Sequence, residues 1–581
     1  MAQHKENERK GTDMKIDPIL LEVIANRLDE IQQVMKHRLF HTGYSTILRE
    51  SFDGSAGLTT PDGRLIGASG MTTHTGPYAR MVQAIVQKYG QLSIHPGDAF
   101  ITNDPYSGGS SHTPDVGTAA PVFVDGELVA FCTSFGHKPD VGGIAPSSAS
   151  AASRSIFHEG LLLPPVKLYE KGLLNEGVKS IIANNSRTPE LLLGDIEGQV
   201  GCTRIGCELI ESLCRQYGVQ SVRAAIEQLL HASEARLRHG LTTLPDGETE
   251  AENWLDSDGA SDRPVRIHVK VIKRGDSITL DFSGCDAQTT GPANAIVNVV
   301  RAAAAGAVVA FVDHTIPYND GIFRAVDMVC PQGRVINPQW PAPVNSYIPA
   351  THLVFNSVTA ALGKLYPPKA VAESGLGLGA IAFSYAATRT GEAYVQYDIV
   401  ETALGGTATA DGASMIFPMM IFETIQPIEI IESEFPVRVR DFSIRQDSAG
   451  AGEHRGGVGF VREYEVLQDC NFMSRLSQRR FGAKGTSGGG APLKSGSIYN
   501  PGRDNERVLQ GLDQVVMKAG DVIRLEQSGG AGLGNPSRRD TQKLLADVAD
   551  GYVSVESAAR DYGRQVSKGK DGHFHLADKA D

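Results

Sequence analysis

The sequence predicts an α+β (mixed α/β) fold divided into several regions. Three observations indicate this class: a long helical stripe near the N-terminus, hairpin patterns with Asp-Gly turns after it, and a glycine-punctuated, strand-like stretch toward the C-terminus. At 581 residues the chain exceeds one ordinary core, since domains average roughly 150 residues. We therefore expect an N-terminal α/β region, a middle mixed region and a β-rich C-terminal module.

The first ordered element should follow a polar tail, residues 1–16. Asp17 can cap a helix that begins with Pro18, where the missing N–H costs nothing. From there to Gly43 the apolar residues recur at helical spacing, as Leu20, Leu21, Ile24, Leu28, Ile31, Met35 and Leu39.

Short strands and turns come next. Residues 58–67 place a Pro-Asp-Gly turn between apolar runs, and residues 120–136 repeat the device with Asp125-Gly126, so both segments predict hairpins. Helical spacing returns over residues 189–217 and 220–239. These helices should close a region that spans residues 17–245.

The rest of the chain divides into three further parts. A middle mixed region, 246–425, should open with a hairpin around Arg274-Gly275-Asp276. Glycine-rich, strand-like sequence predicts a β-rich module at 426–540, and apolar residues at helical spacing predict a helical tail at 541–581.

Composition limits the partners. The net charge is -12 and no basic stripe is present, which argues against nucleic-acid binding and favours protein or small-molecule partners. The N-terminus lacks the apolar centre of a signal peptide, and no segment has eighteen uninterrupted apolar residues, so we expect no membrane association and a cytoplasmic location. The seven cysteines form no CxxC pair and should be reduced, mostly buried thiols.

Residues able to carry chemistry are densest in two loops. The loop 103–117 holds His112 and Asp115 beside a flexible glycine pair. A second cluster places His137 and Asp140 directly after an apolar strand, where side chains are held firmly yet can face a cleft. One hairpin could bring the two clusters together.

Two imidazoles with two or three carboxylates suit a divalent Zn, Mn or Fe ion better than Ca or Mg. Upstream, Glu50 and Asp53 precede the first hairpin, so a further carboxylate could approach the same cleft. The alternative from local sequence is structural: the aspartates would cap turns and the histidines would satisfy local hydrogen bonds. Histidines spaced in a loop do not decide between the two interpretations.

Nucleotide motifs are missing from the sequence. No GxxxxGK[ST] phosphate loop, GxSxG elbow or kinase signature occurs, which excludes an ATP site of the phosphate-loop type. The glycine runs at 374–380 and 529–534 are explained as turns, since the first does not follow a convincing strand and the second lies just ahead of a proline.

The motifs together resemble the hydantoinase B / oxoprolinase family, which includes N-methylhydantoinase B-type subunits and relatives of acetone and acetophenone carboxylase subunits. The resemblance spans nearly the whole chain and runs, in order, through DPILLEVIANRL, TGYSTILRESFDGSAGL, NDPYSGGSSHTPDV, GHKPDVGG, HEGLLLPPVKL, NSRTPELLLGDIEGQ, DFSG, INPQWPAPV, PIEIIESEFPVRV, DSAGAGEHRGGVGFVREY and GGAGLGNP.

The resemblance implies a division of labour. An actin-like partner subunit of the hydantoinase A type would bind ATP and Mg and activate a carbonyl oxygen, and this subunit would complete the reaction at a divalent metal. The metal ligands would then be His112, Asp115, His137 and Asp53, with Asp115 or Asp53 as the catalytic proton acceptor. Asp140 could orient one of the ligands.

Two positions depart from the family pattern. Many members carry two adjacent histidines where this chain has Gly136-His137, and a third glycine where it has Ala449. The loss of one imidazole near the metal could alter proton transfer or substrate shape, and it puts a hydantoin-cleaving activity in doubt.

The leading functional prediction is ATP-dependent ring opening of a small cyclic amide, such as a hydantoin, oxoproline or lactam. The second is ATP-dependent carboxylation of a ketone on the same framework. A stand-alone metallohydrolase and a non-catalytic scaffold for the ATPase are alternatives from other classes, and the motifs do not separate them.

Overall fold

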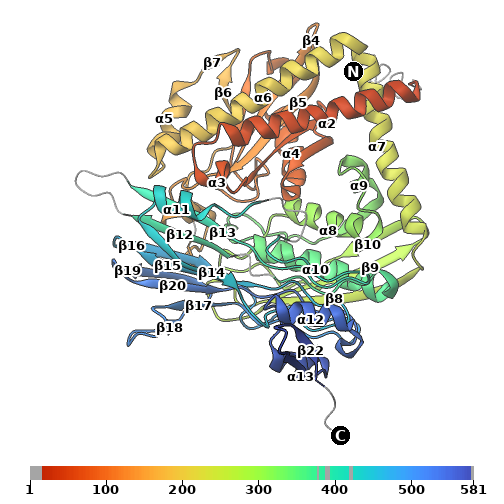
Figure 1. Cartoon of the computed structure of the whole chain (residues 1–581). Coiled ribbons are helices and arrows are strands. Elements are labelled where there is room, and N and C mark those ends of the chain that lie inside the picture. The colour runs from red at the N-terminus through yellow and green to blue at the C-terminus, as the bar shows by residue number, and fades with distance from the viewer. Residues whose placement is uncertain (1–15, 149, 376–378, 386–392, 418–422, 578–581) are drawn as a thin grey trace.

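The computed structural model describes residues 16–148, 150–375, 379–385, 393–417 and 423–577. The fold is α+β, as the sequence predicts. The described strands form sheets of seven, four, four, five and two strands, with helices packed mainly on the first two (Figure 1).

The first long helix begins where its capping signal predicts. Helix α2 (Pro18–His41) has Asp17 at its N-cap, and the Asp17 carboxylate accepts the N–H groups of Ile19 and Leu20. The remaining elements of this region are α3 (Thr46–Arg49), β1 (Gly54–Thr59), β2 (Leu65–Gly70), η1 (Thr72–His74), α4 (Thr75–Tyr89), β3 (Ala99–Thr102), β4 (Asp115–Val124), β5 (Glu127–His137), β6 (Val166–Glu170), β7 (Leu173–Leu174), α5 (Glu176–Asn184), α6 (Pro189–Tyr217) and α7 (Val219–Thr242).

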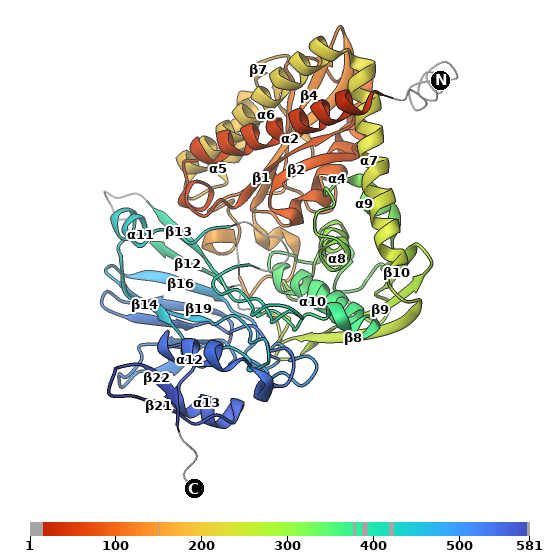
Figure 2. The same cartoon turned by 45° about the vertical axis from the view of Figure 1, so that its right-hand side comes forward.

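These strands build the seven-stranded sheet, in the order β2-β1-β5-β4-β3-β6-β7. Both predicted hairpins are confirmed, as β1–β2 and β4–β5. Helices α2 and α6 lie side by side over one face of the sheet, while α4 packs on the other face (Figures 1 and 2). Because both faces are covered, the central strands are buried along nearly their whole length.

The middle region forms a second layer. Its elements are β8 (Gly247–Leu255), β9 (Val265–Arg274), β10 (Ser277–Asp281), α8 (Val297–Val312), α9 (Asp320–Ala325), β11 (Val326–Val329) and α10 (Ile348–Leu365). The predicted hairpin is β9–β10, although the sheet opens one strand earlier, with β8. Helix α10 packs on β8 and β9, and α8 packs on α10; together with the sheet they form the largest core cluster of the described chain.

Two further sheets pack face to face on a shared apolar core. Their elements are β12 (Gly379–Tyr385), β13 (Tyr394–Val400), α11 (Ile428–Glu434), β14 (Val437–Ile444), β15 (Phe460–Val466), β16 (Cys470–Arg475), β17 (Gly496–Tyr499), β18 (Arg507–Val508), β19 (Leu512–Met517) and β20 (Val522–Glu526). Strands β12 and β13, which precede residue 426, pair in one sheet with β16 and β19, which follow it. The division into domains at residue 426 stays a prediction.

Of the two glycine runs, residues 376–378 of the first lie outside the described residues. The second, 529–534, is irregular chain pressed against other backbone segments. A Cβ added at Gly530 would lie 1.8 Å from the carbonyl oxygen of Leu404, so the backbone approach there requires glycine.

The C-terminal tail contains the predicted helices, α12 (Thr541–Ala549) and α13 (Val555–Tyr562). It also contains a short hairpin, β21 (Val566–Lys568) with β22 (Phe574–Leu576), that the sequence did not predict. Arg539 connects the tail to the irregular segment after β13, because it pairs with Asp411 at 2.8 Å and with Asp547 of α12 at 2.6 Å.

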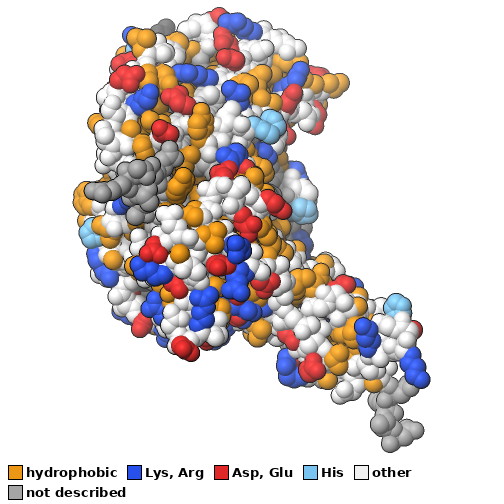
Figure 3. Space-filling view, turned by 60° about the vertical axis from the view of Figure 1, so that its left-hand side comes forward, with side chains coloured by type: hydrophobic (Ala, Val, Ile, Leu, Met, Phe, Trp, Pro, Cys, Tyr) orange, Lys and Arg blue, Asp and Glu red, His pale blue; other side chains and the backbone are white. Residues whose placement is uncertain are grey.

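Several surface and composition expectations can be compared with the structure. All seven cysteines are free thiols and five of them are buried. On the face shown in Figure 3, Lys and Arg side chains are interspersed with Asp and Glu rather than gathered in one stripe. Among the helices of the described chain, none combines the length and apolarity that a membrane crossing requires.

Candidate metal centre

Three of the four predicted ligands lie at one edge of the seven-stranded sheet because of strand pairing. Strands β1, β5 and β4 are adjacent and alternate in direction, so β1 and β4 begin where β5 ends. Asp115 is the first residue of β4 and pairs with His137, the last residue of β5. Asp53 precedes β1, and its carbonyl accepts the N–H of His137 at 3.1 Å.

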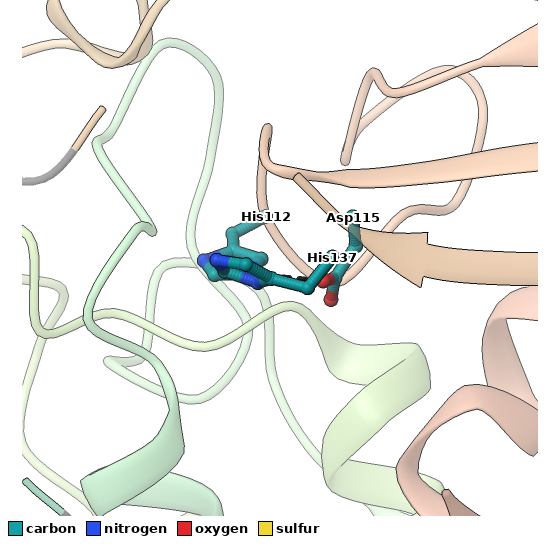
Figure 4. Close-up of side chains that lie close together, drawn as sticks. All are labelled: His112, Asp115 and His137. Atoms are coloured by element: carbon teal, nitrogen blue, oxygen red, sulfur yellow. Dashed lines mark hydrogen bonds and ion pairs between the residues drawn. The ribbon is translucent and has the colours of Figure 1, made fainter. Parts of the chain in front are cut away.

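The fourth residue, His112, reaches the same point from the loop before β4 (Figure 4). Its Nε2 lies 3.1 Å from Asp115 Oδ1 and 3.2 Å from His137 Nδ1. His137 Nδ1 lies 3.2 Å from the same Asp115 oxygen. Asp53 Oδ2 stands slightly farther off, 3.7 Å from His137 Nδ1. All four side chains are buried.

A backbone carbonyl on the side of the ring away from the cluster fixes the orientation of His112. Its Nδ1 lies 3.0 Å from the carbonyl oxygen of Asn345, so Nδ1 carries the proton and Nε2 presents its lone pair to the cluster. The Glu159 carboxylate holds this carbonyl in place by accepting the N–H groups of Val344 and Asn345 at 3.0 and 2.9 Å. Arg475 Nη1 donates to the same carbonyl at 2.9 Å.

Burial and mutual charge set the protonation of the cluster. Burial raises the pKa of Asp53 well above its usual range, and the charge of Asp115 raises it further. Burial alone would also raise the pKa of Asp115, but His112 and hydrogen bonds from His137 and His74 hold it well below its usual range. Burial lowers the pKa of His137 to about 4, so this imidazole is neutral near pH 7 and can act as a ligand.

The remaining walls of the cavity come mainly from the start of α10 and from β12 and β13, with Met71 from the segment after β2. They are mostly apolar or aromatic and consist of Met71, Tyr347, Ile348, Ala380, Tyr397 and Ile399, with the buried carboxyl of Glu423 among them. Burial raises the pKa of Glu423 well above its usual range, and the charge of Asp53 acts in the same direction. Such walls exclude water and strengthen electrostatic interactions inside the cavity.

The donor set fits a divalent cation. Ligand atoms placed 2.0–2.2 Å from a tetrahedral ion lie about 3.3–3.6 Å apart. The three atoms of His112, Asp115 and His137 are separated by 3.1, 3.2 and 3.2 Å, and Asp53 Oδ2 lies 3.7 Å from the His137 atom. Ring nitrogens of His112 and His137 converge on one oxygen of the Asp115 carboxylate, an arrangement that is repulsive unless a cation or proton lies between them. His112, Asp115 and His137 are also close enough to share one ion.

Two candidates from the sequence do not join the cluster. The Asp140 carboxylate accepts Arg187 Nη1 at 2.8 Å and the Arg187 N–H at 2.7 Å, so it braces a loop and contacts no candidate ligand. Glu50 pairs with its neighbour Arg49 at 2.7 Å. At Gly136, an added Cβ would face Lys138 Nζ at 3.0 Å, so the family's second histidine would point toward Lys138 rather than into the cluster.

Other residues at the site gave no local signal in the sequence. His74 lies 3.5 Å from Asp115 Oδ2, and Arg475 contacts the loop behind His112 from a strand more than three hundred residues away. Glu159 lies in the HEGLLLPPVKL motif, but nothing near it indicates that it braces residues 344 and 345. Only tertiary pairing reveals these roles.

The fold and the site define a multi-sheet α+β protein with a buried His/Asp centre at a sheet edge. The family model "Hydantoinase B/oxoprolinase" matches residues 17–536. The chain therefore belongs to the hydantoinase B/oxoprolinase family.

Individual relatives match along almost the full chain. A putative D-/L-hydantoinase B-type subunit from Pseudomonas sp. (strain NS671) is 31% identical over 579 residues, covering 96% of each chain. The crystal structure of an ATP-dependent caprolactamase from Pseudomonas jessenii superposes with a TM-score of 0.88 at 26% identity, covering 95% of this chain and 97% of that one. Nucleotide-free acetone carboxylase superposes equally well, at 0.88, over 97% of this chain and 82% of the other, and its 19% identity makes this a likeness of fold.

Proposed function

We propose that this chain is the metal-bearing catalytic subunit of an ATP-dependent complex, and that the complex opens the ring of a small cyclic amide such as a hydantoin, oxoproline or lactam. The observation that carries the proposal is the convergence of His112, Asp115, His137 and Asp53 in a buried cavity. The aromatic and aliphatic walls suit the hydrocarbon part of such a small ring, while its amide would face the polar cluster.

His112, Asp115, His137 and Asp53 would hold a divalent Zn, Mn or Fe ion. When bound, such an ion supplies Lewis acidity and lowers the pKa of water toward neutrality. The protein's own contribution is to lower the pKa of His137 by burial, to fix the ring of His112 through the Asn345 carbonyl, and to exclude bulk water.

Asp53 is our choice for the catalytic proton acceptor. Oδ1 of Asp115 is contacted by both His112 and His137, and Oδ2 faces His74 at 3.5 Å. Asp53 makes one longer approach, 3.7 Å to His137, and lines the cavity. It can therefore take a proton without disturbing the other ligands.

Amide carbonyls are poor electrophiles, and phosphorylation of the oxygen by a partner would make it a better leaving group. We assign that step to an actin-like ATPase subunit of the hydantoinase A type, which would bind ATP and Mg, and place the complex in the cytoplasm. Support comes from the missing phosphate loop and from a relative that is named as one subunit of a hydantoinase.

The test is to purify the chain natively, identify its partners, and measure ATP hydrolysis with and without cyclic amides. We expect an ATPase subunit to copurify, amide-dependent hydrolysis of ATP, and loss of ring opening in His112→Ala. Activity of the isolated chain without ATP would replace this proposal with a stand-alone metallohydrolase, and unchanged activity of His112→Ala in the complex would indicate a scaffold. Stoichiometric incorporation of labelled bicarbonate into a ketone would instead assign the chain to a carboxylase.

A further inference from the structure

We propose that His74 is a positioning residue that orients Asp115 toward the metal centre, and that a buried chain of hydroxyl groups, Tyr78 and Ser55, fixes the tautomer in which it does so. The inference rests on the proposed metal centre and extends it beyond the four ligands.

The geometry places His74 between Asp115 and Ser55. Its Nε2 lies 3.5 Å from Asp115 Oδ2, on the side of the carboxylate that faces away from His112 and His137. Its Nδ1 lies 2.7 Å from Ser55 Oγ, which is hydrogen-bonded in turn to the hydroxyl of Tyr78. All of these side chains are buried.

Each group in this hydrogen-bonded series can act only as donor or only as acceptor toward its neighbour. As a metal ligand Asp115 would be a carboxylate, whose Oδ2 can only accept, so the proton would be on Nε2 of His74. A neutral imidazole with Nε2–H has an acceptor at Nδ1, so the Ser55 hydroxyl must donate to it. The Tyr78 hydroxyl then donates to Ser55. The direction of donation therefore runs from Tyr78 through Ser55 and His74 to Asp115.

These two atoms face each other without competing partners. Within the described part of the chain, His74 Nε2 and Asp115 Oδ2 are both buried without a hydrogen-bond partner, and they lie 3.5 Å from each other. A buried donor or acceptor without a partner costs about 1–3 kcal/mol, so the pair is held together by the absence of alternatives.

Packing fixes the positions of the His74 and Tyr78 rings. Phe135, on β5 next to the ligand strand ends, contacts His74 and Tyr78 with ring centroids 5.4 and 5.3 Å apart. An added Cβ at Gly57 would lie 2.9 Å from the Tyr78 ring, so the ring can occupy this position only because residue 57 has no side chain. A carboxylate held by a donor on its outer oxygen keeps its other oxygen aimed at the ion.

Two substitutions at the same position separate this role from packing. In His74→Gln the amide NH₂ can reach the position of Nε2 and donate to Asp115, whereas in His74→Asn the shorter amide matches Nδ1 and reaches only Ser55. The measurement is the affinity of the full-length chain for Zn²⁺ by chelator competition, together with the visible spectrum of the Co²⁺-loaded protein, which reports ligand geometry. Thermal unfolding of each variant without metal measures the structural cost separately.

We expect His74→Asn to lose about 10- to 100-fold in metal affinity with an altered cobalt spectrum, and His74→Gln to recover most of the affinity. Equal losses in both variants, in step with thermal destabilisation, would overturn the proposal, because they would make His74 a packing residue. If His74→Asn does not fold, the metal affinity of Tyr78→Phe is measured instead. Its control is Tyr89→Phe, which removes a tyrosine hydroxyl at the other end of α4, away from His74 and Ser55. Equal metal affinities of Tyr78→Phe and Tyr89→Phe would then refute the hydrogen-bonded series from Tyr78 through Ser55 to His74. A wild-type protein that binds no metal would instead refute the proposed metal centre.

Discussion

Replacing Glu159 by glutamine tests whether the loop behind His112 is held by two backbone hydrogen bonds. Each carboxyl oxygen of Glu159 lies at an N–H group, that of Val344 at 3.0 Å and that of Asn345 at 2.9 Å, in a fully buried site. Burial raises the pKa of Glu159 to about 8, although these N–H groups lower it, so the comparison is made at pH 9, where both oxygens accept. Glutamine keeps the shape but has one acceptor oxygen. Its NH₂ group must therefore face one of the two N–H groups.

The expected cost follows from these contacts. One hydrogen bond is lost, worth about 1 kcal/mol, and one buried N–H is left without an acceptor, which costs about 1–3 kcal/mol more. We expect Glu159→Gln to lower the free energy of unfolding by about 2–4 kcal/mol. Since the Asn345 carbonyl orients His112, metal affinity should also fall, by about 10- to 100-fold if the ring is freed.

Urea unfolding without metal measures the first effect, and chelator competition measures the second. The matched control is Glu208→Gln on the exposed face of α6, which should change stability by less than about 0.5 kcal/mol. If Glu159→Gln resembles this control in both assays, the brace from Glu159 to His112 does not exist.

Three further outcomes are expected. Removing metal with a chelator should lower the unfolding temperature, because an ion present at 100 times its Kd stabilises the fold by about 2.7 kcal/mol, and a calorimetric trace unchanged by metal would contradict this. Gly136→Ala should be tolerated, since the added Cβ meets the flexible end of Lys138 at 3.0 Å, whereas Gly136→His should be destabilising; equal unfolding temperatures for the two would refute the crowding argument. Asp411→Asn should destabilise the protein at pH 7 by about 1–3 kcal/mol, because Arg539 lowers the pKa of Asp411 below its unfolded value of about 3.9. That stability is present above the unfolded pKa and is lost as pH falls, so the gap between wild type and Asp411→Asn should close in urea unfolding toward pH 3, and a pH-independent gap would refute the ion pair's role.

Local sequence could predict the elements whose signals are local. Asp17-Pro18 marked the start of α2, and Asp125-Gly126 marked the turn between β4 and β5. Strand β8 was missed because its sequence, GETEAENWL, alternates glutamates with small or polar residues in its first half, and its buried face is recognisable only against α10. The C-terminal hairpin was missed because strands of three residues carry almost no periodicity.

The candidate site likewise contains residues with a local sequence signal and residues without one. His112, Asp115 and His137 could be predicted as a group because a single hairpin brings them together. Asp53 needed the family resemblance, since a lone aspartate before a strand is usually a turn cap. His74, Glu159 and Arg475 could not be predicted, because each acts through a partner that lies far away in sequence or that only the folded sheet brings near.

The two sides of the cavity have different origins, and this bears on how one framework can serve different substrates. The ligands are set at the edge of the first sheet by strand register, which a one-residue slip would destroy. The opposite wall comes from β12, β13 and the start of α10, through Ala380, Ile399 and Ile348. These wall side chains bind no proposed ligand, so their size can change without moving the metal centre. We therefore expect substrate choice within this fold to depend on the wall and the chemistry to depend on the sheet edge.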